Sequence, residues 1–306
     1  MAPNHYLHSL SPVMQATLGV ARRYADSDEP VLLLGEAGTG KSSLAAQIHA
    51  WSGRGGPFVP FPVSASAEQL FHGDLFGHLK GAFTGALAAR IGVLGATAAG
   101  TILLDELSAA SRTMQAAMLA IFDRDAVRSL GEDIGRSVTA RIIGASNVDL
   151  SEEVKANRFR ADLLDRFGVI RITVPPLRDR RCDVLPLFDH FLHGALRPSP
   201  LPRRIVDPTV RSLFETHPWP GNIRELEHVA RATAVLVRDR VDLTVDALPP
   251  YFLERAQSEP TAAPVSWPDR VRVVLDQLGG NKTRAAQYLG MSRTRLYQLL
   301  RTTEAE

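Results

Sequence analysis

The feature that most constrains the fold of this chain is a glycine-rich segment, GEAGTGKS, at residues 35–42. It follows the apolar run Val31–Leu34 and precedes a helical pattern, and this order is typical of a phosphate-binding loop rather than of a simple helix-capping turn. Glycines let backbone N–H groups approach phosphate oxygens, and the start of the helix favours negative charge. The residues expected to bind a nucleotide are Gly35, Glu36, Ala37, Gly38, Thr39, Gly40, Lys41 and Ser42. Lys41 would reach the outer phosphates, and the Ser42 hydroxyl would bind Mg²⁺.

A second strand pattern, GTILLDE at residues 100–106, ends in two carboxylates. In P-loop ATPases the first carboxylate after such a strand holds Mg²⁺, and the second can polarise the attacking water. By itself an apolar run that stops at two acidic residues is common, because many strands end at solvent. Together with the loop upstream it indicates an ATPase core that binds ATP and Mg²⁺, with Asp105 on the metal and Glu106 activating water.

Short apolar runs recur along the first part of the chain and predict buried strands. They lie at residues 31–34, 58–61, 101–104, 141–145 and 169–174. Helical patterns such as 111–124 separate them, and this alternation predicts an α/β fold with a parallel sheet covered by helices. From residue 183 onward the strand patterns stop, and helices are expected at 183–196, 208–217 and 222–237.

The domain boundaries follow from these patterns and from a polar, proline-containing stretch, RAQSEPTAAPVSW, that is typical of a linker. The expected division is an α/β domain at 1–177, a helical domain at 178–253, a linker at 254–266 and a small all-α domain at 267–306. A length of 306 residues suits two domains and a small third.

The composition excludes several classes of protein. No apolar run approaches the length of a membrane span, and the N-terminus lacks the basic and apolar regions of a secretory signal. The short apolar runs therefore predict no membrane partner. The single cysteine, Cys182, rules out an intrachain disulfide framework and predicts a cytoplasmic protein. Cys182 lies in a charged turn without an evident histidine partner, which disfavours a catalytic thiol.

The C-terminal segment is locally basic and predicts two short helices, at 281–290 and 292–301, on either side of Gly290-Met291. Their shared core would consist of Ala285, Ala286, Leu289, Met291, Leu296 and Leu300. Ser292 would cap the second helix and leave polar side chains outward, suited to base edges and phosphates. The residues expected to contact DNA are Lys282, Arg284, Ser292, Arg293, Thr294, Arg295 and Gln298. The alternative is a helical oligomerisation hairpin with a solvated basic face.

Taken together, the motifs resemble those of the sigma-54-dependent transcription activators, the bacterial enhancer-binding branch of the AAA+ ATPases. The matching segments are DLFGHLKGAFTGA at 74–86, GTILLDEL, RIIGASN, FRADLLDRF, PPLRDR and WPGNIRELE, and GGNKTRAAQYLGMSRTRLYQLL resembles the family's Fis-type helix-turn-helix. The resemblance runs from residue 11 to residue 301. It implies an AAA+ P-loop sheet, a helical lid at 178–253 and a helix-turn-helix domain at 267–306.

The resemblance also implies roles for individual residues. The loop that contacts the sigma factor and moves with the nucleotide state would be Gly81, Ala82, Phe83, Thr84, Gly85 and Ala86. Arg160 and Arg166 match the arginine fingers that a neighbouring subunit of a ring supplies to the γ-phosphate. Asn147 matches the first sensor and Arg224 the second, and these four join Asp105 and Glu106 as the expected catalytic set.

The residues by themselves allow plainer roles for several of these positions. The loop at 81–86 could be an ordinary buried turn anchored by Phe83. The arginines could form surface salt bridges, and Asn147 could cap the end of a strand.

Two positions depart from the family pattern. Ser42 stands where most members have glutamate after the P-loop lysine. Pro62 stands where they have an asparagine that can hold the catalytic glutamate in an inactive pose. Proline offers no side-chain hydrogen bond, so the resemblance does not carry this glutamate switch over to the chain, although nucleotide binding is unaffected.

The expected function is that of a ring-forming ATPase, a hexamer, which binds enhancer DNA through its tail, with the C-terminal DNA-binding domains acting as dimers. It would use ATP hydrolysis to remodel the closed complex of the sigma-54 RNA polymerase holoenzyme with a promoter. Because the segment before the P-loop is too short for a sensory domain, control by a partner or by expression is expected, unless the chain is truncated.

Two other functions compete with this expectation. The first is a nucleotide-sensing DNA-binding regulator with the same fold that does not remodel the polymerase. Pro62 favours it, and the intact Phe83-Thr84 pair argues against it. The second is a general AAA+ remodeller or DNA-processing motor, which the same loop and the C-terminal segment disfavour.

Overall fold

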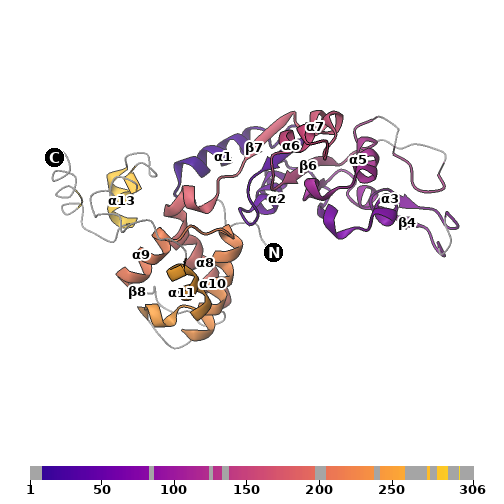
Figure 1. Cartoon of the computed structure of the whole chain (residues 1–306). Helices are drawn as coiled ribbons and strands as arrows, with labels where there is room; N and C mark the ends of the chain where they lie inside the picture. The colour runs from indigo at the N-terminus through magenta and orange to yellow at the C-terminus, as the bar shows by residue number, and fades with distance from the viewer. Residues whose placement is uncertain are drawn as a thin grey trace. The chain divides into compact units, whose positions relative to one another are not determined.

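The computed structural model describes residues 9–82, 86–123, 127–132, 138–196, 205–237, 242–258, 274–275, 281–288 and 296 (Figure 1). The chain divides into two compact units. The first comprises Thr17–Glu36 and Gly40–Val174. The second comprises residues 9–16, Ala37–Thr39 and the described residues from Pro175 onward. Three residues of the predicted phosphate-binding loop therefore group with the second unit.

The first unit is built on a five-stranded sheet with the order β2-β5-β6-β1-β7. The strands are β1 (Val31–Leu34), β2 (Phe58–Pro62), β5 (Thr101–Asp105), β6 (Arg141–Ser146) and β7 (Ile170–Thr173). Each strand predicted from an apolar run is confirmed, and all the pairings are parallel. β6 is buried along its whole length, as expected for an apolar strand of a parallel sheet covered on both faces.

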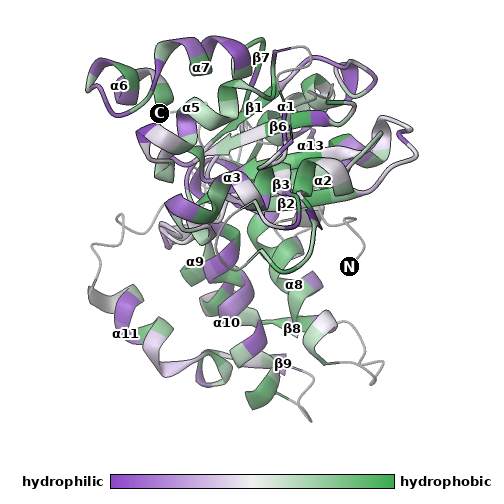
Figure 2. Ribbon diagram, turned by 90° about the vertical axis from the view of Figure 1, so that its right-hand side faces the viewer, coloured by the Kyte–Doolittle hydropathy of each residue, from purple (hydrophilic) through white to green (hydrophobic). Residues whose placement is uncertain are grey.

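Helices connect the strands of this unit. They are α2 (Lys41–Trp51), α3 (Glu68–Phe76), α4 (Val93–Ala96), α5 (Arg112–Leu119), α6 (Leu150–Lys155) and α7 (Ala161–Phe167), with 3₁₀ turns η1 (Val63–Ala65) after β2 and η2 (Leu107–Ala109) after β5. α1 (Pro12–Arg23) precedes β1, and its residues 12–16 group with the second unit. Ser111 caps α5 by accepting a hydrogen bond from the Met114 N–H, as expected for serine at this position. In Figure 2 hydrophobic residues follow the strands, whereas α6 and α7 carry hydrophilic patches.

A small antiparallel pair, β3 (Gly77–His78) and β4 (Arg90–Ile91), flanks the loop predicted to contact the sigma factor. The Gly81 N–H donates to the Ala86 carbonyl at 2.9 Å, which joins the two ends of this loop. Phe83, Thr84 and Gly85 lie outside the described residues. The loop is thus carried by a hairpin, and its binding role stays a prediction.

The second unit is mainly helical, as predicted. It contains η3 (Leu177–Asp183), α8 (Val184–Ala195), α9 (Pro208–Thr216), α10 (Asn222–Leu236) and α11 (Pro250–Ser258). Asp207 caps α9 by accepting from the Thr209 N–H at 2.7 Å, with Pro208 in the first turn. The expectation that strands stop after residue 183 is wrong in one place, because β8 (Ile205–Val206) pairs with β9 (Asp242–Leu243). Two-residue strands are too short to give a periodic signal.

An aromatic core holds the helices of this unit together. Trp219 is fully buried, packs edge-on against Phe214 and stacks on Phe252. Its Nε1 donates to the Phe214 carbonyl at 2.9 Å, which satisfies the one polar atom of the ring. α11 supplies Phe252 and continues to Ser258, so its end lies within the segment 254–266 expected as a linker.

The C-terminal region is described in part. α13 (Lys282–Tyr288) lies within the first helix predicted at 281–290. Ala285, Ala286 and Leu296, from the predicted shared core, are buried in one cluster. Five of the predicted DNA contacts lie outside the described residues: Ser292, Arg293, Thr294, Arg295 and Gln298.

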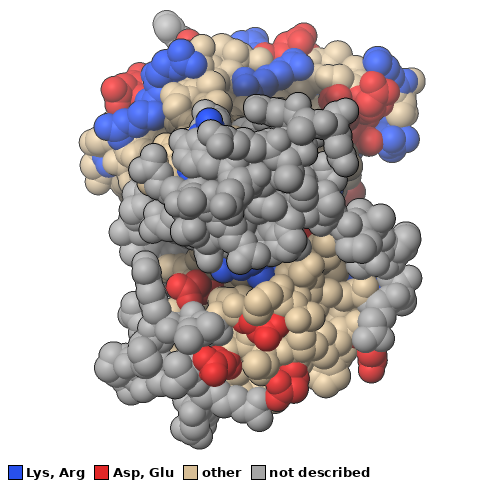
Figure 3. Space-filling model, turned by 90° about the vertical axis from the view of Figure 1, so that its left-hand side faces the viewer, with Lys and Arg blue, Asp and Glu red and all other residues tan. Residues whose placement is uncertain are grey.

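The described surface carries charges of both signs. On the face drawn in Figure 3, basic and acidic side chains lie next to one another, in keeping with the formal net charge of +2. Within the described ranges, no helix has the length and apolar character needed to traverse a bilayer.

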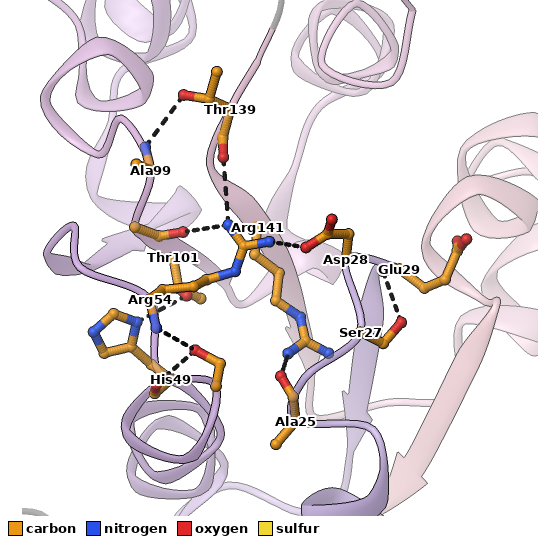
Figure 4. Close-up of polar contacts among 12 residues, drawn as sticks. Ala25, Ser27, Asp28, Glu29, His49, Arg54, Ala99, Thr101, Thr139 and Arg141 are labelled. Atoms are coloured by element: carbon orange, nitrogen blue, oxygen red, sulfur yellow. Dashed lines mark hydrogen bonds and ion pairs between the residues drawn. The ribbon is translucent and has the colours of Figure 1, made fainter.

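A buried arginine, Arg141, lies at the amino-terminal ends of the strands (Figure 4). Arg141, the first residue of β6, is 1% exposed. Its guanidinium donates to the carbonyl of Tyr24 at 2.6 Å and to that of Ala25. Burial lowers the pKa of Arg141, and these carbonyls offset part of the cost of burying its charge.

A second arginine ties the same ends of two neighbouring strands together. Arg54 donates to the carbonyl of Gly100, just before β5, at 3.5 Å and to that of Thr139, just before β6, at 3.4 Å (Figure 4). It also pairs with the exposed carboxylate of Asp28. Neither arginine was singled out from the sequence, because carbonyl partners depend on how the strands align.

Candidate nucleotide site

The phosphate-binding loop connects β1 to α2, where the sequence predicts it. Gly38 has φ +75° and Gly40 has φ +99°, conformations that other residues rarely adopt. A Cβ atom on Gly38 would lie 2.3 Å from the Gly221 carbonyl oxygen. Glycine is therefore required at Gly38 both by the backbone conformation and by the close approach of another backbone segment.

Lys41, the first residue of α2, is buried against the loop. Its ammonium donates to the carbonyls of Gly35 at 2.6 Å and Glu36 at 3.0 Å. Buried lysines are rare because their charge must be compensated. Here the loop carbonyls supply that compensation, and the positive charge is held within the segment that the sequence assigns to phosphate binding.

Ser42 and Asp105 come together at the carboxyl-terminal edge of the sheet. The Ser42 hydroxyl, in the first turn of α2, donates to Asp105 Oδ2 at the end of β5 at 2.7 Å. β6 lies between β5 and β1, the strand that precedes the loop and α2. Asp105 Oδ1 accepts from the Glu106 N–H at 2.9 Å, which orients the carboxylate. The pairing predicted from two separate motifs is therefore present.

These two side chains fit Mg²⁺. The ion prefers hard oxygen ligands and is usually held by one or two protein oxygens together with phosphates and water. Ser42 and Asp105 provide a hydroxyl and a carboxylate in direct contact. No group of three or more His, Cys, Asp or Glu residues that could hold a metal occurs in the described part of the chain.

Glu106 follows β5 in an unusual conformation. Its φ is +59°, a left-handed value that is uncommon for a residue other than glycine and often marks functional sites. Its side chain is exposed, and Oε2 accepts a hydrogen bond from the hydroxyl of Ser64 in η1. Pro62, which cannot make this contact, lies two residues earlier at the end of β2. The sequence does not single out Ser64, although it lies two residues after Pro62, one of the positions that depart from the family pattern.

Asn147 lies at the same edge of the sheet. It directly follows β6, is exposed, and its Oδ1 accepts from the Ser108 hydroxyl at 3.1 Å. Ser108 belongs to η2, which begins immediately after Glu106. The structure therefore connects the predicted sensor to the segment that carries the predicted base, through a serine that the sequence did not single out.

Arg160 and Arg166 lie at the two ends of α7 and are paired with acids of the same chain. Arg160 makes a two-pronged contact with Asp162, at 3.0 and 2.8 Å. This hydrogen bond raises the pKa of Arg160 and lowers that of Asp162. Arg166 lies 3.5 Å from Asp123. None of these contacts joins the arginines to Ser42, so they stay outside the cluster formed by Lys41, Ser42, Asp105 and Glu106. Their action from a neighbouring subunit stays a prediction.

Four other residues considered in the sequence have clear positions in the chain. Arg224 is exposed in the first turn of α10, and its Cβ would lie 3.2 Å from a Cβ on Gly38. Lys282 is exposed at the start of α13, and Arg284 lies in the same helix. Cys182 is buried, and burial raises the pKa of its thiol to about 12, which agrees with the expectation that it is not catalytic.

Three family models match successive parts of the chain. The model of the sigma-54 interaction domain matches residues 7–173, that of the AAA+ ATPase lid domain matches 178–264, and that of the bacterial regulatory proteins of the Fis family matches 270–301.

Similar proteins agree with these matches. The C4-dicarboxylate transport transcriptional regulatory protein DctD of Rhizobium meliloti is 34% identical, over 95% of this chain and 62% of its own length. The transcriptional regulatory protein ZraR of Klebsiella oxytoca is 37% identical, over 94% of this chain and 66% of its own length. The chain thus spans less than two thirds of either relative. The crystal structure of NtrX from Brucella abortus in complex with ATP has a TM-score of 0.72 and 26% identity, over 96% of this chain and 68% of that one.

The family models together span the sheet, the helices of the second unit and most of the C-terminal segment from residue 270. The strands at the expected positions, the loop between β1 and α2, and the contact between Ser42 and Asp105 agree with them. This chain therefore belongs to the family of proteins with a sigma-54 interaction domain, followed by an AAA+ ATPase lid domain and a Fis-family regulatory domain.

Proposed function

We propose that the chain hydrolyses ATP and uses this reaction to activate transcription by the sigma-54 RNA polymerase holoenzyme. The observation that carries the proposal is the 2.7 Å contact between Ser42 Oγ and Asp105 Oδ2, with Lys41 and Glu106 adjacent to them in the chain. A hydroxyl, a carboxylate, a cation and a second carboxylate are the groups that phosphoryl transfer to water requires. Family membership supports the polymerase as the target.

Each residue of the cluster has a distinct task in this proposal. The loop amides and Lys41 bind the phosphates, while Ser42 and Asp105 would hold Mg²⁺, which neutralises developing charge when it is bound. Glu106 accepts a proton from the attacking water, since its carboxylate is exposed and directly follows Asp105, the residue that contacts Ser42. Asn147 and Arg224 complete the set as sensors of the nucleotide.

The two arginines are proposed to act on the nucleotide of a neighbouring subunit in a ring. Their partners, Asp162 and Asp123, are more than half exposed. Exposed ion pairs contribute little stability, so Arg160 and Arg166 can exchange these acids for a phosphate at small cost. A ring, hexameric in this family, arises when a head-to-tail interface closes on itself.

Other parts of the chain are proposed to bind the partners of this activity, the sigma factor and DNA. The loop at 81–86, held by the β3–β4 hairpin, would contact the sigma factor. The helices at 267–306 would bind enhancer DNA through Lys282, Arg284 and the polar residues at 292–298. The same proposal includes the domain division at 1–177, 178–253, 254–266 and 267–306. It also includes a cytoplasmic location, which the single Cys182 favours.

The test uses purified chain, sigma-54 holoenzyme and a sigma-54 promoter with an enhancer site. We expect phosphate release from ATP, and transcripts that require hydrolysable ATP. Transcripts formed equally well with a non-hydrolysable analogue would contradict the proposal. Nucleotide and DNA binding without transcripts would instead favour a regulator that senses nucleotide but does not remodel the polymerase, the alternative suggested by Pro62.

A further inference from the structure

The tip of the phosphate-binding loop makes its hydrogen bonds with the helical unit. Three successive carbonyls take part, those of residues 37, 38 and 39. Ala37 O accepts from Asn222 Nδ2 at 3.1 Å, and Gly38 O accepts from the backbone N–H of Ile223 at 2.9 Å. Thr39 O accepts from Arg180 Nη2 at 2.8 Å. The three donors come from η3 and from the start of α10, and all belong to the same compact unit as the tip.

The side-chain donor of Asn222 is itself held in place. Asn222 is fully buried, and its Oδ1 accepts from the Leu177 N–H at 2.7 Å while its Nδ2 reaches the loop. Both ends of the amide are therefore engaged, which fixes its orientation. Its φ of +52°, like the +50° of Trp219, shows that the turn before α10 adopts a conformation uncommon outside glycine.

Arg180 is a buried cation that interrupts the regular turn of η3. It is 1% exposed, with φ −133° and ψ +49° inside the 3₁₀ segment. Asp183 lies close enough for the charge of Arg180 to oppose the rise that burial gives the pKa of its carboxyl. That carboxylate accepts in turn from the Leu10 N–H at 2.7 Å. A buried cation is costly unless it is compensated, and here it is directed at a loop carbonyl.

Fixing the carbonyls also fixes the amides on which phosphate binding depends. A trans peptide is planar, and its N–H points opposite to its C=O. When the carbonyls of residues 37–39 are turned toward Asn222, Ile223 and Arg180, the N–H groups of residues 38–40 are turned away from these donors. These are amides of the segment that the proposed function assigns to the phosphates, and amides aligned before binding need no reorganisation.

We infer that Arg180 and Asn222 are positioning residues for nucleotide binding, which hold the loop amides in the orientation that receives phosphate. The inference rests on the proposed function, since it takes the loop to bind a nucleotide. It assigns to the helical unit a direct part in the affinity of the loop, through carbonyl contacts rather than through contact with the nucleotide.

The test measures the affinity of the full chain for a fluorescent ADP analogue. Asn222→Asp keeps the size, the acceptor for Leu177 and a residue that tolerates positive φ, but replaces the donor to Ala37 with an oxygen. Arg180→Met removes the donor to Thr39, whereas Arg180→Lys retains a donor and a charge. We expect affinity to fall about 10-fold for Asn222→Asp and further for Arg180→Met, with partial recovery in Arg180→Lys.

A matched control separates positioning from general loss of structure. Trp219→Phe removes the hydrogen bond to the Phe214 carbonyl in the core of the same unit and leaves the three loop contacts in place. It should lower the melting temperature but leave ADP affinity within about twofold. Competition with adenosine gives a second readout. Because adenosine has no phosphate, its affinity should be unchanged in the Asn222 and Arg180 variants.

Each outcome decides a specific point. Equal losses for ADP and adenosine, or unchanged ADP affinity in folded Asn222→Asp and Arg180→Met proteins, would overturn the inference while leaving the proposed function intact. Failure of the unaltered chain to bind ADP would overturn the proposed function and the inference with it.

Discussion

The two ends of the five-stranded sheet hold charged side chains in different ways. At the amino-terminal end, Arg141 and Arg54 donate to four backbone carbonyls, and Arg54 adds one ion pair with the exposed Asp28 (Figure 4). At the carboxyl-terminal end, serine hydroxyls meet carboxylates: Ser42 contacts Asp105 and Ser64 contacts Glu106. Backbone partners are fixed by the fold, whereas side-chain hydroxyls and carboxylates can exchange one another for a ligand or water. The first end therefore serves stability, and the second is suited to chemistry.

The largest effect is expected from Glu106, at the carboxyl-terminal end of the sheet. Glu106→Gln keeps the shape and an acceptor for Ser64 but cannot accept a proton, so ATP hydrolysis should fall by about 10²–10⁴-fold. Nucleotide affinity should change little, because the side chain acts on water rather than on phosphate. Single-turnover hydrolysis together with ADP binding measures both. Near-normal turnover would remove Glu106 from the proposed mechanism.

Removal of the P-loop lysine should affect binding itself. In Lys41→Ala the cation held by the carbonyls of Gly35 and Glu36 is lost, and we expect affinity for ATP to fall about 100-fold. Titration with a fluorescent nucleotide gives the value. A melting temperature close to that of the unaltered chain would show that the loss is local. Retained affinity would mean that the loop amides alone bind the phosphates.

The opposite end of the sheet should respond in stability and not in affinity. Arg141→Met fills the space of the side chain but leaves the carbonyls of Tyr24 and Ala25 without their donor, at a cost of about 2–4 kcal/mol of unfolding free energy. Arg54→Met, whose salt-bridge partner Asp28 is exposed, should cost less than about 1 kcal/mol. Urea unfolding compares the two. If Arg141→Met weakened nucleotide binding in folded protein, the contrast between the two ends would fail.

The smallest effect is expected from Ser64, in the rate of basal ATP hydrolysis. The Ser64 hydroxyl donates a hydrogen bond to a carboxylate oxygen of Glu106 that could otherwise accept one from water. We expect Ser64→Ala to raise basal hydrolysis about threefold, with unchanged nucleotide affinity. Ser66→Ala is the matched control, because Ser66 makes a similar contact with Asp74, at 2.8 Å, away from the cluster. A rise in both variants would point to a general effect of the segment after β2.

Features that depend only on neighbouring residues can be predicted from the sequence. The buried strands follow from short apolar runs, and the start of α9 follows from the capping Asp207 and from Pro208, because periodicity and capping are local. The loop at 35–42 could be assigned to phosphate because its glycines and lysine act within a few residues of one another. The strand pattern at 100–106, which ends in two carboxylates, then predicts that this loop works together with Asp105.

Contacts between residues far apart in the sequence depend on how the chain folds. Ser64 reaches Glu106 because β2 and β5 are neighbours with Pro62 opposite Asp105, and apolar periodicity encodes neither strand order nor register. For the same reason, the carbonyl partners of Arg141 could not be foreseen. Asn222 and Arg180 lie far along the chain from the loop whose carbonyls they hold. Their donors find these partners only because folding brings separate backbone segments together, and a buried polar group must then be satisfied by whatever lies beside it.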